Sequence, residues 1–549
     1  MIDLGEKIVY QIYPKSFRDS NGDGLGDLPG VIEKLDYLQG LGADYLWLTP
    51  VYPSPQNDNG YDVSDYCAID PRFGTMEDMD RLIAESEKRG LKVMLDMVFN
   101  HTSTAHEWFR KALAGEKEYQ DYYIFRDGTG DQLPTNWQSK FGGPAWEYVP
   151  ALGKWYLHLF DVTQADLNWE NPRVREELKN VIRFWKGKGV KGFRFDVVNL
   201  ISKPETFTDD LMGDGRRFYT DGPHIHEYLK ELTGDTGIEE LMTVGEMSST
   251  HLKDCIRYSN PEERELSMCF HFHHLKVDYR DGDKWSLMEP DRMELKRLFE
   301  EWQMGMQKAH GWNALFWCNH DQPRIVSRLG DEGKYWKQSA KMLGACIHLM
   351  QGTPYIYQGE EIGMMNPHFQ EIGQYRDVES LNYYGILLEQ GKTEKEALEI
   401  LAARSRDNSR TPMQWSGEDG CGFTEGTPWI EAARNYGEIN VRTQMAEEDS
   451  IYHFYRKLIA MRKEKAVISK GSIEFLMQEN PDVLAYRRRY QGEEVVVLNN
   501  LTGKEAAVLA ESVWCGYEKI LGNYEDSRTM EGAVRLRPFE VLVLEKRGS

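Results

Sequence analysis

The sequence predicts an α/β protein: a (β/α)8 TIM barrel, with a small domain inserted after the third strand and a C-terminal antiparallel β-sandwich. Two observations predict the barrel: eight short apolar segments recur within the first 360 residues, and amphipathic helical patterns lie between them. A third observation concerns the end of the chain, where short strands separated by polar turns replace this alternation after about residue 470. The chain has 549 residues, which is too long for one hydrophobic core.

Most of the eight apolar segments are continuously hydrophobic, as is typical of strands covered on both faces. They span residues 8–14, 44–50, 91–99, 192–198, 241–247, 266–272, 313–320 and 353–361. Helical patterns between them include residues 75–90 and 171–189, and a glycine closes each of these two. Eight strand–helix units in sequence predict a closed parallel barrel.

A long insertion separates the third strand from the fourth. Residues 101–167 are rich in aromatic residues and glycine and show no long helical pattern, so we expect a small irregular domain there. This assigns 1–100 and 168–469 to the barrel and 470–549 to the C-terminal sandwich. Because the insertion follows the carboxyl end of a barrel strand, it lies at the face that carries active sites in such barrels.

The composition argues against several kinds of partner and location. A formal net charge of −23 disfavours nucleic acids and anionic membranes as partners. The sequence has no apolar run long enough to span a membrane and no N-terminal signal-peptide pattern. The 7 cysteines are scattered without CxxC pairs, which fits free thiols in a reducing compartment. We therefore expect a cytoplasmic enzyme, and nothing in the sequence suggests more than a monomer.

Charged residues and a histidine stand at or near the ends of several predicted strands. They are Asp96, Arg194, Asp196, Glu246, His320 and Asp321. A charge within an apolar strand is costly unless it is paired or functional. One such residue could belong to a structural ion pair, but several at one rim of a barrel indicate a functional site.

Paired carboxylates in one pocket are the equipment of glycoside hydrolysis, in which one attacks the anomeric carbon and the other protonates the leaving oxygen. Arg194 lies two residues before Asp196, so both side chains point to the same side of the strand. The guanidinium favours the anionic form that a nucleophile needs. Glu246 follows Gly245 in a largely apolar strand, where partial desolvation favours the protonated form of an acid.

Five segments carry a specific resemblance. DMVFNH, QADLNW, GFRFDVVN, VGEM and NHDQPR, in this order along the chain, resemble the signature segments of the α-amylase family of glycoside hydrolases. The resemblance implies a retaining double displacement with Asp196 as nucleophile, Glu246 as general acid/base and Asp321 as transition-state stabiliser.

Other segments resemble the oligo-1,6-glucosidase and dextran glucosidase branch of that family. They are GYD at 60–62, QADLNW at 164–169 and SRDNSRTPMQW at 405–415. In that branch Asp62 and Arg406 would clamp the terminal glucose, so the resemblance implies an exo-acting enzyme. The same subsite would include Tyr61, His101, Phe141, Phe160, Gln164, Arg194 and His320.

Residues 199–229, 269–285 and 314–335 resemble, more narrowly, the trehalose-6-phosphate hydrolases. This resemblance implies hydrolysis of trehalose 6-phosphate, a disaccharide phosphate, to glucose and glucose 6-phosphate. The alternative is cleavage of α-1,6 bonds at the non-reducing ends of isomalto-oligosaccharides, and Val197 after the nucleophile resembles members with that preference.

A phosphate on the leaving sugar would need basic donors. We expect His273, Lys276 and Lys284 to supply them, from a loop that also holds His274 and Arg280. Arg216 and Arg217 in the loop after the fourth strand are further sources. Acidic residues interleave with the first three, so a solvated surface role is the alternative for each. A glycine-rich phosphate loop is missing, which argues against a nucleotide site.

Residues 19–27, DSNGDGLGD, place oxygen donors at alternate positions. The donors are Asp19, Asn21, Asp23, the carbonyl of Leu25, and Asp27. The pattern resembles the first half of an EF-hand loop but lacks its final glutamate, since position 30 is glycine. Similar loops in the oligo-1,6-glucosidase branch hold one structural Ca²⁺, so we expect calcium here, with a plain turn as the alternative. No catalytic cofactor is expected.

Overall fold

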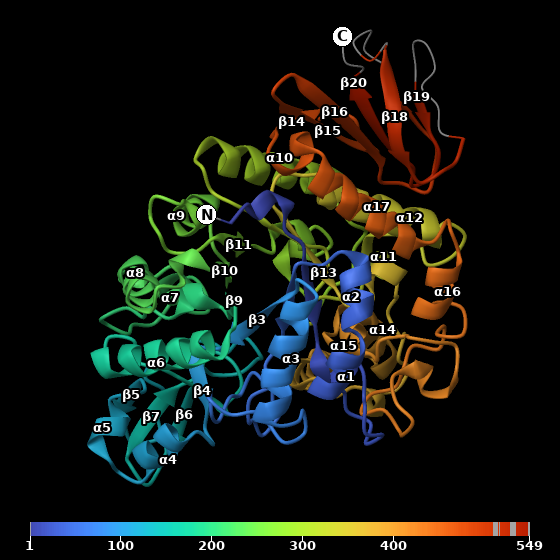
Figure 1. Cartoon of the computed structure of the whole chain (residues 1–549). Helices are drawn as coiled ribbons and strands as arrows, with labels where there is room; N and C mark the ends of the chain where they lie inside the picture. The colour runs from blue at the N-terminus through green and yellow to red at the C-terminus, as the bar shows by residue number, and fades with distance from the viewer. Residues whose placement is uncertain (1, 509–513, 515, 527–533, 547–549) are drawn as a thin grey trace.

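The computed structural model describes residues 2–508, 514, 516–526 and 534–546. Its centre is a parallel sheet, of which β3, β9, β10, β11 and β13 are labelled in Figure 1. The strands follow the order β11-β10-β9-β3-β2-β1-β13-β12. These strands are β1 (Val9–Ile12), β2 (Tyr45–Leu48), β3 (Lys92–Met97), β9 (Gly192–Phe195), β10 (Met242–Glu246), β11 (Met268–Phe270), β12 (Ala314–Leu315) and β13 (Thr353–Tyr357). Each coincides with one of the eight predicted segments, so the prediction of their number and order is confirmed.

The sheet closes into a barrel between its two outer strands. A parallel bridge joins Cys269 of β11 to Asn313, directly before β12. The amide of Cys269 also donates to the carbonyl of Trp312 at 3.3 Å. Closure removes the free sheet edges and brings the carboxyl ends of all eight strands to one rim.

Helices surround the strands, and several begin and end where the sequence signals them. Thr75 and Asp78 form a capping box at the start of α3 (Met76–Lys88). Gly189 adopts φ 103° at the end of α6 (Pro172–Lys188), a conformation that favours glycine. The other longer barrel helices are α1 (Leu28–Glu33), α2 (Leu35–Leu41), α8 (Ile225–Thr236), α9 (Leu252–Ser259), α10 (Arg292–Lys308), α11 (Ile325–Leu329), α12 (Trp336–His348), α13 (Val378–Glu389), α14 (Glu394–Arg404), α16 (Val441–Ala446) and α17 (Ile451–Glu464).

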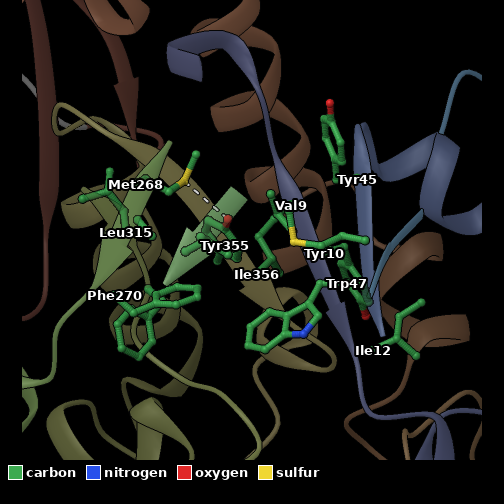
Figure 2. Close-up of a cluster of buried hydrophobic side chains, with 14 of the residues drawn as sticks. Val9, Tyr10, Ile12, Tyr45, Trp47, Met268, Phe270, Leu315, Tyr355 and Ile356 are labelled. Atoms are coloured by element: carbon green, nitrogen blue, oxygen red, sulfur yellow. Dashed lines mark hydrogen bonds between the residues drawn. The ribbon is translucent and has the colours of Figure 1, made fainter. Parts of the chain in front are cut away.

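Aromatic side chains fill the barrel interior (Figure 2). The ring of Phe270 lies 4.6 Å from that of Tyr355 and 5.6 Å from that of Trp47, measured between centroids. These three residues come from β11, β13 and β2, and each is nearly inaccessible to solvent. The barrel is therefore a packed core rather than a pore, and its strand ends are held rigidly.

The inserted segment forms its own small sheet beside the barrel (Figure 1). Strands β5 (Phe125–Asp127), β7 (Lys154–Leu157) and β6 (Trp146–Val149) pair antiparallel. Strands β4 (His101–Ser103) and β8 (Gln164–Asp166) pair at its base, and the short helices α4 (Glu107–Leu113) and α5 (Lys117–Gln120) complete it.

The C-terminal part is an antiparallel sheet of β14 (Ser472–Leu476), β15 (Val483–Tyr490), β16 (Glu493–Asn500), β20 (Val541–Lys546) and β18 (Tyr517–Gly522), accompanied by the pair β17 (Ala506–Val508) and β19 (Val534–Leu536). A fully buried arginine of this sheet, Arg488 of β15, binds the barrel, and a second buried arginine, Arg462 of α17, binds the same region from within the barrel part. Arg488 donates to the carbonyl of Leu349 at 2.6 Å, and Arg462 donates to that of His348 at 2.9 Å. These carbonyls end α12, so the two arginines satisfy acceptors that the helix leaves open.

Two further sequence expectations concern membranes and thiols. Across the described ranges, no helix is long and apolar enough to cross a membrane. The six described cysteines are free: Cys67, Cys255, Cys269, Cys318, Cys346 and Cys421. Cys515 lies outside the described residues.

A buried lysine ties the insertion to the barrel. The ammonium of Lys203 lies 2.8 Å from a carboxylate oxygen of Asp166 in β8 and donates to the amide oxygen of Asn100, after β3, at 2.8 Å. It also donates to the carbonyl of Leu200 at 2.6 Å. All three donor positions are thus satisfied, and Asp166 has a buried counter-ion.

We predict that Lys203→Met lowers the free energy of unfolding by about 3–5 kcal/mol, because Asp166 would remain buried without its charge partner. Denaturant unfolding of the purified variant measures this. The matched control is Lys395→Met, whose side chain is 87% exposed and should change stability little. An equal, small effect of both substitutions would contradict a bridging role for Lys203.

Candidate active site

The strand ends surround one cavity of ≈390 Å³. Asp196, Glu246 and Asp321 all line it, so the structure brings the three expected catalytic carboxylates together. Asp196 follows β9, Glu246 ends β10, and Asp321 lies in the loop after β12. The next residue after Asp196, Val197, adopts φ 36°, a conformation that is rare for a β-branched residue and turns the chain sharply at this point.

Arg194 lies beneath the cavity and organises two of these carboxylates. Its guanidinium is fully buried; Nη1 donates to Asp96 at 2.7 Å and to Asp196 at 2.7 Å, while Nη2 contacts Glu246. The carboxylates of Asp196 and Glu246 therefore contact the two terminal nitrogens of the same guanidinium group. Such close spacing favours the retaining geometry, in which the two carboxyl groups are about 5 Å apart.

Asp321 has a separate set of partners, two arginines and a buried histidine. Arg410 donates to it at 2.7 Å, Arg406 lies 3.4 Å away, and Nε2 of His320 lies 3.3 Å away. Burial alone would raise the pKa of Asp321, but His320, Arg406 and Arg410 lower it well below its ordinary value. Asp321 is therefore ionised at neutral pH and can stabilise positive charge on a substrate.

One end of the cavity is closed by a buried ion pair. Arg406 donates to Asp58 at 2.8 Å and to Asp377 at 2.5 Å. Its guanidinium also lies 4.7 Å from the ring centroid of Phe141. Asp58 and Arg406 both line the cavity, where they can hold the hydroxyls of one terminal sugar.

The expectation that Asp62 forms this clamp with Arg406 is wrong. Asp62 is fully buried, does not line the cavity and accepts hydrogen bonds from Ser54, Asn57 and Asp58. Its carboxylate shapes the loop that carries Asp58. Gln164, expected to touch the sugar, also lies behind the cavity and donates to Asp58 at 3.0 Å.

The other expected sugar-binding residues divide into lining and supporting positions. Tyr61, His101, Phe141 and Phe160 line the cavity. The ring of Tyr61 stacks on His320 at 5.0 Å with an interplanar angle of 3°. His320 and Arg194 are fully buried outside the lining, so they act through the residues they hold.

Comparison with known proteins agrees with this geometry. Residues 11–471 match the model of the α-amylase catalytic domain. The chain belongs to the α-amylase family. The chain is 55% identical to trehalose-6-phosphate hydrolase of Escherichia coli (strain K12), covering 97% of each chain. It is 45% identical to oligo-1,6-glucosidase of Parageobacillus thermoglucosidasius, covering 99% of this chain and 98% of the other. The crystal structure of trehalose-6-phosphate hydrolase from Bacillus licheniformis superposes with a TM-score of 0.94, at 53% identity and 99% coverage of both chains.

Within this α-amylase-family site, two of the three basic residues expected to bind phosphate line the cavity. Lys276 does so without a carboxylate partner among the described residues. Lys284 also lines it, but its ammonium is bound to Glu379 at 2.6 Å. The expectation for His273 is not supported by position: its ring packs 4.9 Å from Trp302 and lies outside the lining.

Two further cations line the same cavity. Arg216, from α7 (Arg216–Tyr219), was expected from the sequence only as one of several loop cations, and it is paired with Asp214. Lys140, from the inserted segment, carries no sequence signal, because a single lysine in an aromatic-rich loop resembles any surface residue. Only the folding of the insertion over the barrel rim brings Lys140 to the site.

The expected calcium loop curls around Asp19. The carboxylate of Asp19 accepts hydrogen bonds from the amides of Asn21 at 2.9 Å, Gly22 at 2.7 Å and Gly24 at 2.8 Å. The donor set is made of oxygens only, which suits a hard cation such as Ca²⁺. Within the described ranges, no group of three or more His, Cys, Asp or Glu side chains is arranged to hold a metal.

We predict that Asp58→Asn lowers kcat/KM for a glucosidic substrate by about tenfold to a hundredfold, because the carboxyl group that holds Arg406 and accepts from a sugar hydroxyl is lost. Steady-state kinetics with 4-nitrophenyl α-glucoside measure the effect. The control is Asp65→Asn, an exposed residue of the same loop region that lies outside the cavity. Normal activity of Asp58→Asn would contradict the Asp58–Arg406 clamp.

Proposed function

We propose that the protein is an exo-acting, retaining α-glucosidase that hydrolyses trehalose 6-phosphate to glucose and glucose 6-phosphate. The observation that carries the proposal is that Lys140, Arg216 and Lys276 line the same cavity as the three carboxylates. Two of these cations, Lys140 and Lys276, have no carboxylate within ion-pair distance among the described residues. Unpaired ammonium groups that line a cavity suit an anionic substrate group.

The reaction follows from the positions of the carboxylates. Asp196 attacks the anomeric carbon while Glu246 donates its proton to the glycosidic oxygen, and glucose 6-phosphate leaves. Glu246 then takes a proton from water, the water oxygen attacks the same carbon, and the bond to Asp196 breaks. Two displacements at one carbon retain its configuration.

The neighbouring residues act on the charges that change during these steps. Arg194 orients the Asp196 carboxylate through a 2.7 Å hydrogen bond. Asp321, ionised between Arg406 and Arg410, faces the positive charge that develops on the sugar ring in the transition state. The Asp58–Arg406 pair closes the cavity beyond one terminal glucose, so no further sugar unit of a substrate can bind on that side. This makes the enzyme exo-acting.

The second candidate is an oligo-1,6-glucosidase. Val197 lies in the cavity directly after the nucleophile, which resembles members that prefer α-1,6 bonds. The catalytic groups are the same for both candidates. The two candidates differ in their need for the basic residues that line the cavity, Lys140, Arg216 and Lys276. A neutral isomalto-oligosaccharide has no group that requires them.

We further propose a monomeric, cytoplasmic enzyme. A phosphorylated sugar does not cross membranes unaided, and the six free cysteines within the described ranges suit a reducing compartment. The substrate is a small molecule; neither nucleic acid nor membrane is required.

We predict that purified protein hydrolyses trehalose 6-phosphate with a kcat/KM at least about a hundredfold above that for trehalose, because the phosphate gains charge-assisted hydrogen bonds that trehalose cannot form. Glucose release from trehalose 6-phosphate, trehalose and isomaltose at equal concentration measures this preference. Rapid cleavage of isomaltose with little of trehalose 6-phosphate would establish the second candidate instead.

We also propose that loop 19–27 holds one structural Ca²⁺ through Asp19, Asn21, Asp23, Asp27 and the carbonyl of Leu25. The alternate oxygen donors and the curled backbone support this assignment. The ion would fix the loop between β1 and α1 and take no part in the chemistry.

We predict that chelation by EDTA lowers the melting temperature by a few degrees and that Ca²⁺ restores it, because an ion that binds only the folded state stabilises it. Differential scanning calorimetry measures the shift. Asp23→Asn should weaken the response, whereas a melting temperature insensitive to both EDTA and Ca²⁺ would leave the loop as a plain turn.

A further inference from the structure

Lys140 differs in its surroundings from Arg216 and Lys284, two other cations that line the cavity. Arg216 is paired with Asp214, and Lys284 is paired with Glu379. The ammonium of Lys140 instead donates to the hydroxyl of Ser248 at 3.0 Å and lies 5.7 Å from the ring centroid of Tyr219. No carboxylate of the described residues lies within ion-pair distance of it.

The contact with Ser248 fixes where Lys140 faces. Ser248 lies two residues after Glu246 and is itself held on both sides, since its amide donates to the side chain of Asn199 at 2.9 Å and its carbonyl accepts from the same side chain at 2.9 Å. Glu246 protonates the leaving oxygen. A cation anchored beside Glu246 therefore faces the leaving sugar, which carries the phosphate.

The charge state of Lys140 depends on what occupies the cavity. Burial, with Arg216 and Lys276 nearby, lowers the pKa of Lys140 to about 7, against weaker opposing effects of Asp214 and Asp166. Above that pH the free side chain is mostly neutral. A phosphate dianion placed against it reverses the balance, because the charged form of the lysine then gains a partner.

We propose that Lys140 is a specificity-determining residue that selects the phosphorylated leaving sugar and takes up a proton when the phosphate binds. The proposal rests on the proposed function. It adds a residue that selects the substrate and a coupling between phosphate binding and proton uptake. The proton comes from solvent and stays on the ammonium while the phosphate is bound; no covalent bond of the substrate is involved. The insertion, rather than the barrel, thus supplies part of the substrate selectivity.

The pH dependence follows from the sign of the shift. The pKa of Lys140 is lowered in the free enzyme, so the charged, binding-competent form is present below about pH 7 and is lost as the pH rises. We therefore expect kcat/KM for trehalose 6-phosphate to fall with increasing pH above about 7. We expect Lys140→Arg to lose this part of the pH dependence of kcat/KM, because an arginine stays charged throughout this pH range.

The first test is the ratio of kcat/KM for trehalose 6-phosphate to that for 4-nitrophenyl α-glucoside. We expect Lys140→Met to lower this ratio by about tenfold to a hundredfold, because one charge-assisted bond to phosphate is lost. Lys253→Met, an exposed lysine outside the cavity, is the matched control. An unchanged ratio in Lys140→Met, with a wild-type enzyme that prefers trehalose 6-phosphate, would overturn the inference and leave the proposed function standing. A wild-type enzyme without that preference would instead overturn the proposed function.

The second test is proton uptake. Isothermal titration calorimetry of glucose 6-phosphate binding at pH 8, in two buffers of different ionisation enthalpy, counts the protons taken up; the phosphate is already a dianion at this pH. We expect net uptake by the wild-type enzyme and a clear decrease in Lys140→Arg, which still binds the phosphate. Equal uptake in both proteins would show that Lys140 is not the group that titrates.

Discussion

A single buried guanidinium, that of Arg194, is the constraint on which the site depends. It is enclosed by Asp96, Asp196 and Glu246 at the carboxyl ends of three adjacent strands, β3, β9 and β10. Burying such a charge costs several kcal/mol of folding free energy unless carboxylates surround it. The three strands must therefore keep their register so that all three carboxylates reach the guanidinium of Arg194. The barrel meets this requirement with a rigid aromatic core directly beneath. Stability of the fold and alignment of the two reacting carboxylates thus rest on the same contacts.

The remaining parts of the site are added around this centre and decide what it accepts. Arg406 and Arg410, directly before and at the end of the short helix α15 (Asp407–Arg410), keep Asp321 ionised and close the cavity behind one sugar. The insertion after β3 is fixed to the barrel by Lys203 and brings Lys140 over the rim. The barrel therefore carries the chemistry shared by the α-amylase family, while segments outside its strands set the size and charge of the substrate.

Much of the fold and the catalytic centre could be predicted because local sequence determines them. Continuous apolar segments define the strands, and carboxylates at their ends are costly unless functional. The wrong expectation for Asp62 and the unsupported one for His273 both concern residues in loops or short turns. Asp58 and Asp62 lie in one turn, and only its folded path shows that Asp62 bonds to its own backbone while Asp58 faces Arg406. His273 and Lys276 are three residues apart in a 3-10 turn, yet one packs on Trp302 and the other reaches the cavity. Lys140 is brought to the site by tertiary contacts alone, so no pattern in the sequence could reveal it.

The double displacement requires that Asp196, held by Arg194, forms a covalent bond to the sugar. The most direct measurement is to trap that bond with 5-fluoro-α-glucosyl fluoride, whose ring fluorine slows the second displacement while the leaving fluoride lets the first proceed. Mass spectrometry of a proteolytic digest then locates the attached sugar. We expect a fluoroglucosyl group on Asp196. A label on another carboxylate, or turnover that gives the inverted anomer without any label, would contradict it.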